Sequence, residues 1–524
     1  MIIPKKVKHI KEYSRAELEQ RYLELEQKNE SLSARLQWYE EQFRLSRQQR
    51  FGSSSEKSMP DQISIFNEPE AETVVFCPEP AIEEVIVKPK KKKKGHKASV
   101  LKDFPKEIIE YRLSAEEDCT QCGEELHEMS KQVRTELTVI PAKVSVTEHV
   151  SYIYSCRSCE KQDITVPVIK AKAPAPVITK SLASPSLVSY IMTRKYMEAL
   201  PLYRQEQQFK HNGIRITRQT MANWMIKASH DWLKLLYEKM HEKLQTKDIL
   251  HADETEVEVL CEPNRPASKS SYMWMYRTSG DSVPIILFNY REGRSGSYPK
   301  EFLKNFSGYL HVDGYAGYNK LENVTLAGCW AHARRKYDEA LKSIPKNTES
   351  ALTACQEGLA YCNRLFEIER SLCDLDFTKR KEERQRLSRP VVEAYFAWLH
   401  VQKELALPQS YLGKAITYSL NQKEKLVAFL EDGRIEVSNN RAERSIKPFV
   451  IGRKNWLFSN TPKGATASAM IYSIIETAKE NKLKPFEYLI YIFEQLPNSD
   501  ISDDTVIANC LPWSKELPDY CRTT

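Results

Sequence analysis

The sequence predicts a multidomain α+β protein, with a mixed α/β core that follows a helical segment and a small cysteine-rich domain. At 524 residues, the chain has room for roughly three to four domains of about 150 residues each. A heptad pattern occupies the N-terminal part, and two C-x-x-C pairs follow it. From residue 248 onward, short alternating apolar segments are interleaved with helical patterns, which is typical of strands and helices in one core.

Composition and charge limit the possible classes of protein. The formal charge of +7 is mildly basic, which permits nucleic-acid binding without requiring it. With only 16 glycines, the chain does not look like a glycine-rich nucleotide-binding protein. The N-terminus lacks the apolar region of a signal peptide, and no apolar stretch approaches the length of a membrane span. Widely spaced cysteines suit a reducing compartment, so we expect a cytoplasmic protein that does not contact a membrane.

Residues 14–50 are predicted to form a long helix. Ser14 and Glu17 make a capping box. Apolar residues recur every seven positions, and an asparagine at one a position would set register and partner number. The heptad positions are Leu18, Tyr22, Leu25, Asn29, Leu32, Leu36, Tyr39 and Phe43. A coiled coil that joins two chains is the favoured interpretation, and an amphipathic helix packed on its own protein is the alternative.

Residues 51–104 are predicted to be a disordered basic linker, and the segment "KPKKKKKGHK" at 88–97 carries most of its positive charge. Such runs are usually solvated tails. They also make non-specific, salt-dependent contacts with phosphates. The two interpretations are compatible.

Residues 105–165 are predicted to be a zinc-binding domain. Two C-x-x-C pairs in one short segment are a strong signal for a tetrahedral site with one structural Zn²⁺. Alternating apolar residues between the pairs indicate a zinc ribbon, whereas a lone pair would also suit redox chemistry. The four predicted ligands are Cys119, Cys122, Cys156 and Cys159.

A proline-rich linker at 166–186 leads into a helical segment, 181–246, that has the outline of a helix-turn-helix. One helix ends at Gly213, and the next starts after Thr217 as N-cap. Its apolar side carries Met221, Trp224 and Met225. An ordinary helical pair is the alternative. The candidate base or phosphate contacts are Arg218, Gln219 and Asn223.

The predicted core spans 247–480. In "ILHADETEVEVL", Asp253, Thr255, Val257 and Val259 share one face and the three glutamates share the other. Two further strands follow as an antiparallel meander. The order is three strands, helix, strand, helix, strand and helix if the helix of Glu443 closes it, which is the ribonuclease H layout. A charged, strand-free stretch at 343–430 reads as a helical insertion, and 481–524 as a C-terminal helix and tail.

Three carboxylates stand out in this core. Asp253 lies on the apolar side of a strand, where an unpaired carboxylate is costly. Asp313 ends a second strand, and Glu443 shares a helix face with Asn439 and Asn440, behind Ser438 as a possible cap. Carboxylates from separate elements can hold two Mg²⁺ (or Mn²⁺) ions for phosphoryl displacement. Taken singly, each is by default an acid in a salt bridge.

Long motifs in a fixed order give a family resemblance. "HADET", "HVDGYAGY", "CWAHARRKY" and "NNRAERS...GRKNWLF", behind the two C-x-x-C pairs, closely resemble the transposases of the IS66 family of bacterial insertion sequences. The resemblance covers nearly the whole chain. It implies a DDE transposase with a ribonuclease H-like core and the triad Asp253, Asp313 and Glu443. It also implies DNA partners (element ends and target), accessory proteins of the same element, and a bacterial, nucleoid-associated location.

Cations beside the motifs are candidate phosphate contacts. Solvated basic faces of ordinary helices are the alternative, and Trp456 and Phe458 are expected to pack in the core. The family usually has aspartate where this chain has Ser438, and a Gly/Arg/Pro-rich segment where it has the lysine run. Glu436 is expected to be exposed. The candidate DNA contacts here are His332, Arg334, Arg335, Arg444, Lys447, Arg453 and Lys454.

Two other functions fit parts of the pattern. One is a catalytically inactive protein that binds element ends, although all three carboxylates are present. The other is a ribonuclease H-like nuclease, which would not need the coiled coil, zinc segment and helix-turn-helix. Cutting and joining of labelled element ends distinguishes a transposase from both, because a repressor only binds and a nuclease only cuts.

Removal of residues 1–50 is predicted to lower the assembly state without unfolding the core. The heptad helix is expected to supply the interface between chains, and no globular pattern in the rest of the sequence depends on that helix. Light scattering of the truncated chain measures the number of chains per particle. The same number as in the full-length protein would contradict the prediction.

Cys122→Ser is predicted to release the zinc and disorder the region around 119–159 while the catalytic core stays folded. Structural zinc contributes on the order of 10 kcal/mol or more to such small units, so a ribbon missing one thiolate should not fold. Elemental analysis measures the metal, and a parent protein without zinc would refute the prediction.

Overall fold

The computed structural model describes most of the chain from residue 172 onward and short parts before it. The described residues are part of 15–29, and 144–155, 168–170, 172–266, 268–343 and 349–523. The chain divides into two compact units, one formed by 55–170 and the other by 1–54 with 171–524. Among the described residues, no helix is both long enough and apolar enough to cross a membrane.

The N-terminal part is described only in places. The described residues between 15 and 29 are helical and exposed, including the heptad residues Tyr22 and Leu25. This agrees with the predicted helix, while its pairing with a second chain stays a prediction. In the second unit, β1 (Ile153–Ser155) and β2 (Val168–Lys170) pair as an antiparallel hairpin. The lysine-rich linker and the four predicted zinc ligands lie outside the described residues.

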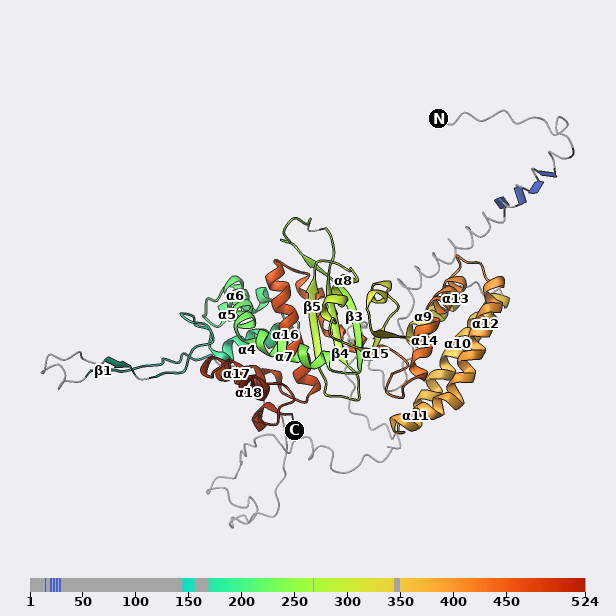
Figure 1. The fold of residues 1–524 in the computed structure, drawn as a ribbon. Coiled ribbons are helices and arrows are strands. Elements are labelled where there is room, and N and C mark those ends of the chain that lie inside the picture. Colours follow the sequence, from blue (N-terminus) through green and yellow to red (C-terminus); the bar gives the residue numbers. More distant parts are fainter. Residues whose placement is uncertain are drawn as a thin grey trace, which may run out of the picture. The chain divides into compact units, whose positions relative to one another are not determined.

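A mixed sheet forms the centre of the larger unit (Figure 1). Its order is β5-β4-β3-β6-β7, and the short β8 pairs with the end of β3. The first three strands form the predicted antiparallel meander, whereas β6 and β7 run parallel to β3. The strands are β3 (Ile249–Val259), β4 (Ser271–Thr278), β5 (Ile286–Arg291), β6 (Gly308–Val312), β7 (Val324–Gly328) and β8 (Phe458–Ser459).

The connections within the sheet are short. Helix α8 (Ser297–Phe302) leads into β6, and α9 (Trp330–Ser343) follows β7. Between β6 and β7 the predicted order has a helix, but the structure has only the 3₁₀ segment η4 (Ala316–Lys320). Parallel neighbours need a crossover, and here this compact segment makes it.

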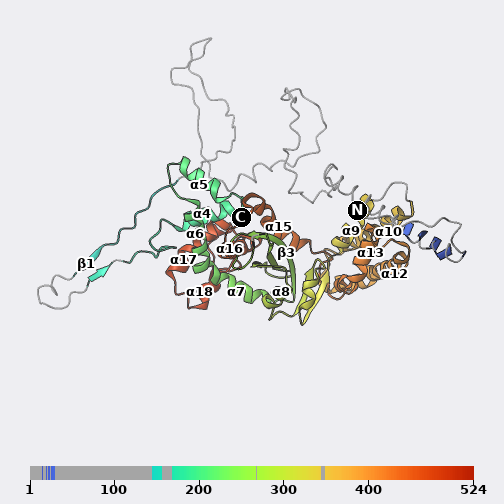
Figure 2. The same cartoon turned by 90° about the horizontal axis from the view of Figure 1, so that it is seen from above.

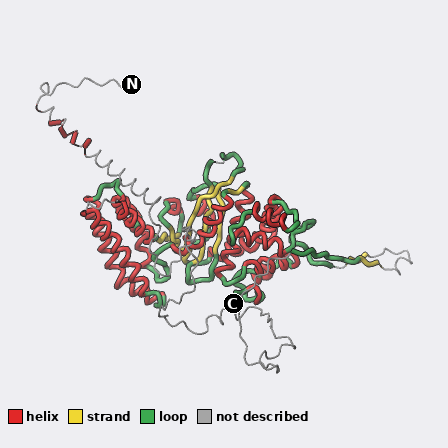
Figure 3. The backbone as a smooth tube through the Cα atoms, turned by 180° about the vertical axis from the view of Figure 1, so that it is seen from behind, coloured by secondary structure: helices red, strands yellow, loops and turns green. Residues whose placement is uncertain are grey.

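Helices flank the sheet on two sides, as Figures 1 and 2 both show. The tube in Figure 3 shows the same arrangement from behind, with the strands between two groups of helices. One group comes from the chain before β3 and from the chain after residue 439, and it packs with the sheet into one apolar cluster. It comprises α4 (Pro185–Tyr196), α5 (Leu202–His211), α6 (Arg218–Ala228), η3 (Ser229–Leu233), α7 (Lys234–Gln245), α15 (Asn440–Trp456), α16 (Pro462–Glu480), α17 (Pro485–Gln495), η7 (Leu496–Asn498), α18 (Asp504–Asn509) and η8 (Asp519–Cys521).

Helix α16 covers the edge of the sheet at β5. The Ile286 amide donates to Thr477 Oγ1 at 2.9 Å, and the Phe288 amide donates to Ser473 Oγ at 2.8 Å. These helix hydroxyls satisfy backbone groups that an open edge strand would leave unpaired. Buried Arg277 on β4 adds a second link, because it donates to Glu480 of α16 and to Ser445 of α15.

The predicted helix, turn and helix are present as α5 and α6. Gly213 follows α5 with a φ of +79°, a conformation in which glycine carries no steric penalty. Thr217 caps α6 by accepting a hydrogen bond from the Thr220 amide at 3.1 Å. Met221, Trp224 and Met225 are buried, as their spacing predicts.

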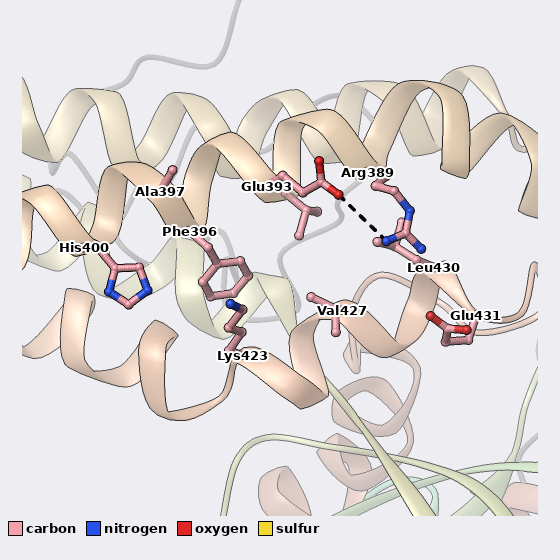
Figure 4. A pocket seen from close by; sticks show the side chains of 10 residues that line it. Arg389, Glu393, Phe396, Ala397, His400, Lys423, Val427, Leu430 and Glu431 are labelled. Atoms are coloured by element: carbon pink, nitrogen blue, oxygen red, sulfur yellow. Dashed lines mark ion pairs between the residues drawn. The ribbon is translucent and has the colours of Figure 1, made fainter.

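The stretch predicted as a helical insertion contains only helices among its described elements, and it packs with α9 and the adjoining part of the sheet into a second apolar cluster. A groove of about 430 Å³ runs between α12 and α14, where Lys423 lies over the Phe396 ring (Figure 4). None of the predicted site residues lines it. The elements are α10 (Glu349–Ser371), α11 (Phe377–Glu383), η5 (Arg384–Ser388), α12 (Arg389–Leu405), α13 (Tyr411–Asn421), α14 (Lys423–Val427) and η6 (Ala428–Leu430).

Candidate active site

Two His-x-Asp segments lie side by side at the centre of the sheet. The parallel pairing of β3 and β6 places His251 opposite His311. Continued by two residues, the same register brings Asp253 beside Asp313. Because side chains alternate along a strand, each aspartate shares a face with its histidine. The two imidazole rings stack with centroids 5.1 Å apart and planes 6° from parallel.

Helix α15 is fixed to this face by Asn439. The buried amide accepts a hydrogen bond from His251 Nδ1 at 2.9 Å and donates to the Ala252 carbonyl at 2.8 Å. His311 Nε2 donates to the Glu436 carbonyl at 2.9 Å. Burial lowers the pKa of His251 and of His311 to about 3. Both rings are therefore neutral at physiological pH and hold the strands and the start of α15 together.

Glu443 follows Asn439 by one helical turn. Its carboxylate lies 3.7 Å from His332 Nδ1 and 3.4 Å from the Arg335 guanidinium, both on α9. The first turn of a helix favours negative charge, so this position suits a glutamate. Two predicted site residues, His332 and Arg335, are thus neighbours of a third.

The carboxylates act on one another electrostatically. Burial raises the pKa of Asp253 well above its usual value, and the negative charges of Glu254, Asp313 and Glu443 raise it further. Like charges close together in a partly buried site are unfavourable. The structure therefore brings the three predicted acids into one electrostatic group that would be stabilised by a cation.

The donor set of this group fits hard divalent cations. Mg²⁺ and Mn²⁺ prefer oxygen ligands, and Asp253, Asp313 and Glu443 supply carboxylate oxygens from a strand, a strand end and a helix. Glu443 Oε1 is buried and has no hydrogen-bond partner among the described residues. A buried carboxylate oxygen without a hydrogen bond is unfavourable, and a bound cation would satisfy it.

A fourth acid, Glu254, was placed by the sequence only on the opposite face of β3. Glu256 and Glu258 are exposed there, but the Glu254 side chain is 1% exposed. It accepts hydrogen bonds from the Tyr318 hydroxyl and the Arg294 guanidinium, both at 2.6 Å. Since Tyr318 belongs to the segment after Asp313, Glu254 ties that segment to β3.

Arg294 completes this contact. Its guanidinium lies 4.0 Å from the centroid of the Tyr315 ring, a favourable cation–π distance. The Tyr315 amide donates to Asp313 Oδ1 at 3.0 Å. Glu254, Arg294 and the two tyrosines therefore form a chain of contacts that positions Asp313. The signal for it in the sequence was the acidic pair at 253–254.

The candidate DNA contacts fall in three places. Arg218, Gln219 and Asn223 are exposed on α6. Arg335 and Arg444 are exposed near Glu443. The remaining cations have other neighbours or other positions: Arg334 donates to Asn363 of α10, Arg453 donates to the Glu256 carbonyl, and Lys447 and Lys454 lie further along α15.

Three local expectations were wrong. Ser438 does not cap α15, because Asn439 occupies the N-cap position and, among the described residues, no side chain makes the capping hydrogen bond. Phe458 is 43% exposed on β8, whereas Trp456 packs against Tyr196 and Tyr472 as expected. Glu436 is half-buried and pairs with Arg441 at 2.6 Å.

The sequence reasoning missed the supporting residues His251 and His311, and it placed Asn439 beside Glu443 without predicting its contacts with β3. A signal was present, because His-x-Asp occurs twice, at 251–253 and at 311–313. When the same motif occurs on two neighbouring parallel strands, the two copies can lie in register. That reasoning would have predicted that Asp253 and Asp313 are adjacent.

Comparison with family models places the chain. The model described as "Transposase IS66 family" matches residues 180–467, which is more than half of the chain. The chain belongs to the IS66 transposase family. Three shorter models match other parts of this IS66 transposase: "zinc-finger binding domain of transposase IS66" at 116–160, "IS66 C-terminal element" at 473–513 and "Transposase C of IS166 homeodomain" at 38–109. The zinc-finger match contains all four predicted cysteine ligands.

Curated relatives of this IS66 transposase come from Sinorhizobium fredii. Uncharacterized protein y4jD is 31% identical over 434 residues, which cover 78% of this chain and 81% of the relative. Uncharacterized protein y4qI is 30% identical over 426 residues, covering 78% and 75%. The similarity therefore extends over most of each protein.

Asp253→Asn is predicted to stabilise the IS66 transposase in magnesium-free buffer. The raised pKa means that the negative charge is unfavourable in the folded state, so the parent's stability falls as the pH rises above the unfolded-state pKa of about 4. Removing the charge should raise the thermal midpoint by about 1–4 °C near neutral pH. Tryptophan fluorescence during heating measures this.

Added Mg²⁺ should raise the midpoint of the parent more than that of Asp253→Asn. Glu258→Gln is the matched control, because Glu258 is an exposed acid on the same strand, and its midpoint should equal the parent's. A lower midpoint for Asp253→Asn than for the parent in magnesium-free buffer would contradict the electrostatic account.

Proposed function

We propose that this protein is a DDE transposase that binds the ends of an insertion sequence and catalyses metal-dependent cleavage and transfer of DNA strands. The single observation that carries the proposal is the electrostatic group of Asp253, Asp313 and Glu443. These are the acids that the motifs single out, and they come from three elements that are far apart in the sequence. Membership of the IS66 family supports the same chemistry.

The sheet supports a ribonuclease H-like core. Three antiparallel strands, β5, β4 and β3, are followed across the sheet by the parallel β6 and β7. The ribonuclease H layout predicted from the sequence has this strand arrangement, in which an antiparallel meander is extended by parallel strands. In the proposal, Asp253 on β3 and Asp313 directly after β6 come together, and α15 brings Glu443 to them.

The three carboxylates would hold two Mg²⁺ or Mn²⁺ ions, and such a pair supplies activation of the attacking oxygen and stabilisation of the leaving oxygen. The protein's own residues do the positioning. Neutral His251 and His311 keep the two strands and Asn439 in place without adding charge. Glu254 and Arg294 hold the segment that carries Asp313. Arg335 offers a positive charge beside the site for a phosphate of the DNA backbone.

DNA would be held by surfaces outside the carboxylate group. Arg218, Gln219 and Asn223 form an exposed polar patch on α6, which suits contact with a duplex. Arg444 lies next to Glu443 and suits a phosphate contact. The zinc domain, with one structural Zn²⁺, and the coiled coil would recognise and pair two element ends in a homodimer. The proposed partners include accessory proteins encoded by the same element, and the proposed location is the bacterial nucleoid.

Glu443→Gln is the sharpest test of this function. The change keeps the size of the side chain and the helix but removes the charge that holds a divalent ion. Cleavage and joining of labelled element ends in Mg²⁺ should fall by at least about 100-fold. Binding of the same ends, measured by gel shift, should persist because other surfaces contact the DNA.

Glu258→Gln is the control, and it should cut and join at the parent rate. Near-parental cleavage by Glu443→Gln would exclude Glu443 from the catalytic group. Cutting without joining by the parent would indicate a nuclease, and binding without cutting would indicate an inactive end-binding protein.

A further inference from the structure

Beside the carboxylate group lies a cluster of different chemistry. Cys329, His332 and Glu443 each offer a ligand atom, and these three atoms lie within 4.8 Å of one another. His332 Nδ1 and Glu443 Oε1 are 3.7 Å apart. Both atoms are buried, and within the described part of the chain neither has a hydrogen-bond partner. Unpaired buried polar atoms that face each other need a ligand between them or carry a cost.

The local sequence explains why these side chains meet. Cys329 directly follows β7, and His332 lies three residues later in the first turn of α9, so both side chains can reach the same side. The backbone N–H of Asn439 donates to Cys329 Sγ at 3.1 Å. This bond links Cys329 to the start of α15, which carries Glu443 in its first turn. The three ligands therefore come from two helix starts that are fixed to each other.

We propose that Cys329, His332 and Glu443 form a site for a thiophilic divalent cation such as Zn²⁺. Sulfur, imidazole nitrogen and carboxylate oxygen are ligands that Zn²⁺ accepts together, whereas Mg²⁺ prefers oxygen alone. Tetrahedral zinc separates such ligands by about 3.3–3.6 Å, close to the observed 3.7 Å between His332 and Glu443. All three ligand atoms lie within 4.8 Å of one another. The most distant pair would therefore have to approach by about one ångström or less when the ion binds.

Access and charge agree with this assignment. The Cys329 sulfur is buried, while the side chains of His332 and Glu443 are 24% and 32% exposed. An ion would enter past these two and reach the sulfur last. Coordination displaces the thiol proton to solvent, as metal binding to cysteine does. A fourth ligand would be water, because three protein ligands leave one position of a tetrahedral site open.

The site shares Glu443 with the proposed magnesium site. An ion held by Cys329 and His332 would keep Glu443 away from Asp253 and Asp313. This consequence rests on the proposed function: Zn²⁺ should inhibit strand cleavage in Mg²⁺ by occupying a site that Mg²⁺ does not use. The binding itself does not depend on that function.

Equilibrium dialysis of the full-length protein against buffered Zn²⁺, followed by elemental analysis, tests the binding. The parent should bind one more equivalent of zinc than Cys329→Ser or His332→Gln, and the finger cysteines contribute equally to all variants. Cys362→Ser is the matched control, because Cys362 is also a buried cysteine and is not part of the cluster. Its zinc content should equal the parent's.

Equal zinc content in the parent, Cys329→Ser and His332→Gln would overturn the proposal. Two variants are used because Cys329→Ser places a hydroxyl in a buried position, and His332→Gln keeps that position intact. Tryptophan fluorescence on heating checks that each variant is folded.

Cleavage of labelled element ends tests the consequence. In Mg²⁺, the parent and Cys362→Ser should lose activity at the same added Zn²⁺, and Cys329→Ser should need at least tenfold more for the same loss. Equal inhibition of all three would refute the shared use of Glu443. If the parent binds the extra zinc but does not cut DNA in any metal, the proposed function fails while the zinc site stands.

Discussion

The parallel register of β3 and β6 is the constraint on which the rest of the site depends. It pairs His251 with His311, and the alternation of side chains then carries Asp253 and Asp313 to the same face. A slip of one residue would turn one aspartate to the other side of the sheet. Stacked neutral imidazoles, closed over by Asn439, make such a slip costly. The same contacts set where α15 begins, and hence where Glu443 lies.

Four carboxylates lie close together in this partly buried region, where their mutual repulsion lowers the stability of the folded state. The pKa of Asp253 is raised by burial and by three neighbouring carboxylates, and the pKa of Glu254 is raised by burial and by Asp313. Hydrogen bonds from Tyr318 and Arg294 oppose the second shift. Unfavourable charge of this kind is common at functional sites, which is consistent with the function proposed for this group.

Much of the fold could be predicted from the sequence, because strand and helix periods are local. The meander, β6, β7 and α9 follow directly from alternation and helical spacing. The triad residues could be named from motifs, but their support could not. Glu254 was assigned to a face by alternation alone, and only the tertiary fold brings Tyr318 and Arg294 over it. Ser438 satisfied the rule for a cap, yet the contacts of Asn439 with β3 move the helix start by one residue. Phe458 is exposed on β8, opposite the exposed Glu258 of β3.

The order in which these parts are synthesised follows from the cover that α16 gives to β5. Strands β3 to β7, with both aspartates, leave the ribosome before the long helical stretch, and Glu443 and the hydroxyls of Ser473 and Thr477 come after it. A nascent chain that ends before residue 440 thus has two of the three acids and an uncovered strand edge. Such an intermediate lacks the third acid of the proposed catalytic group, and it exposes backbone that can pair with another strand. If the proposed function holds, synthesis completes the catalytic group only when the chain is nearly finished.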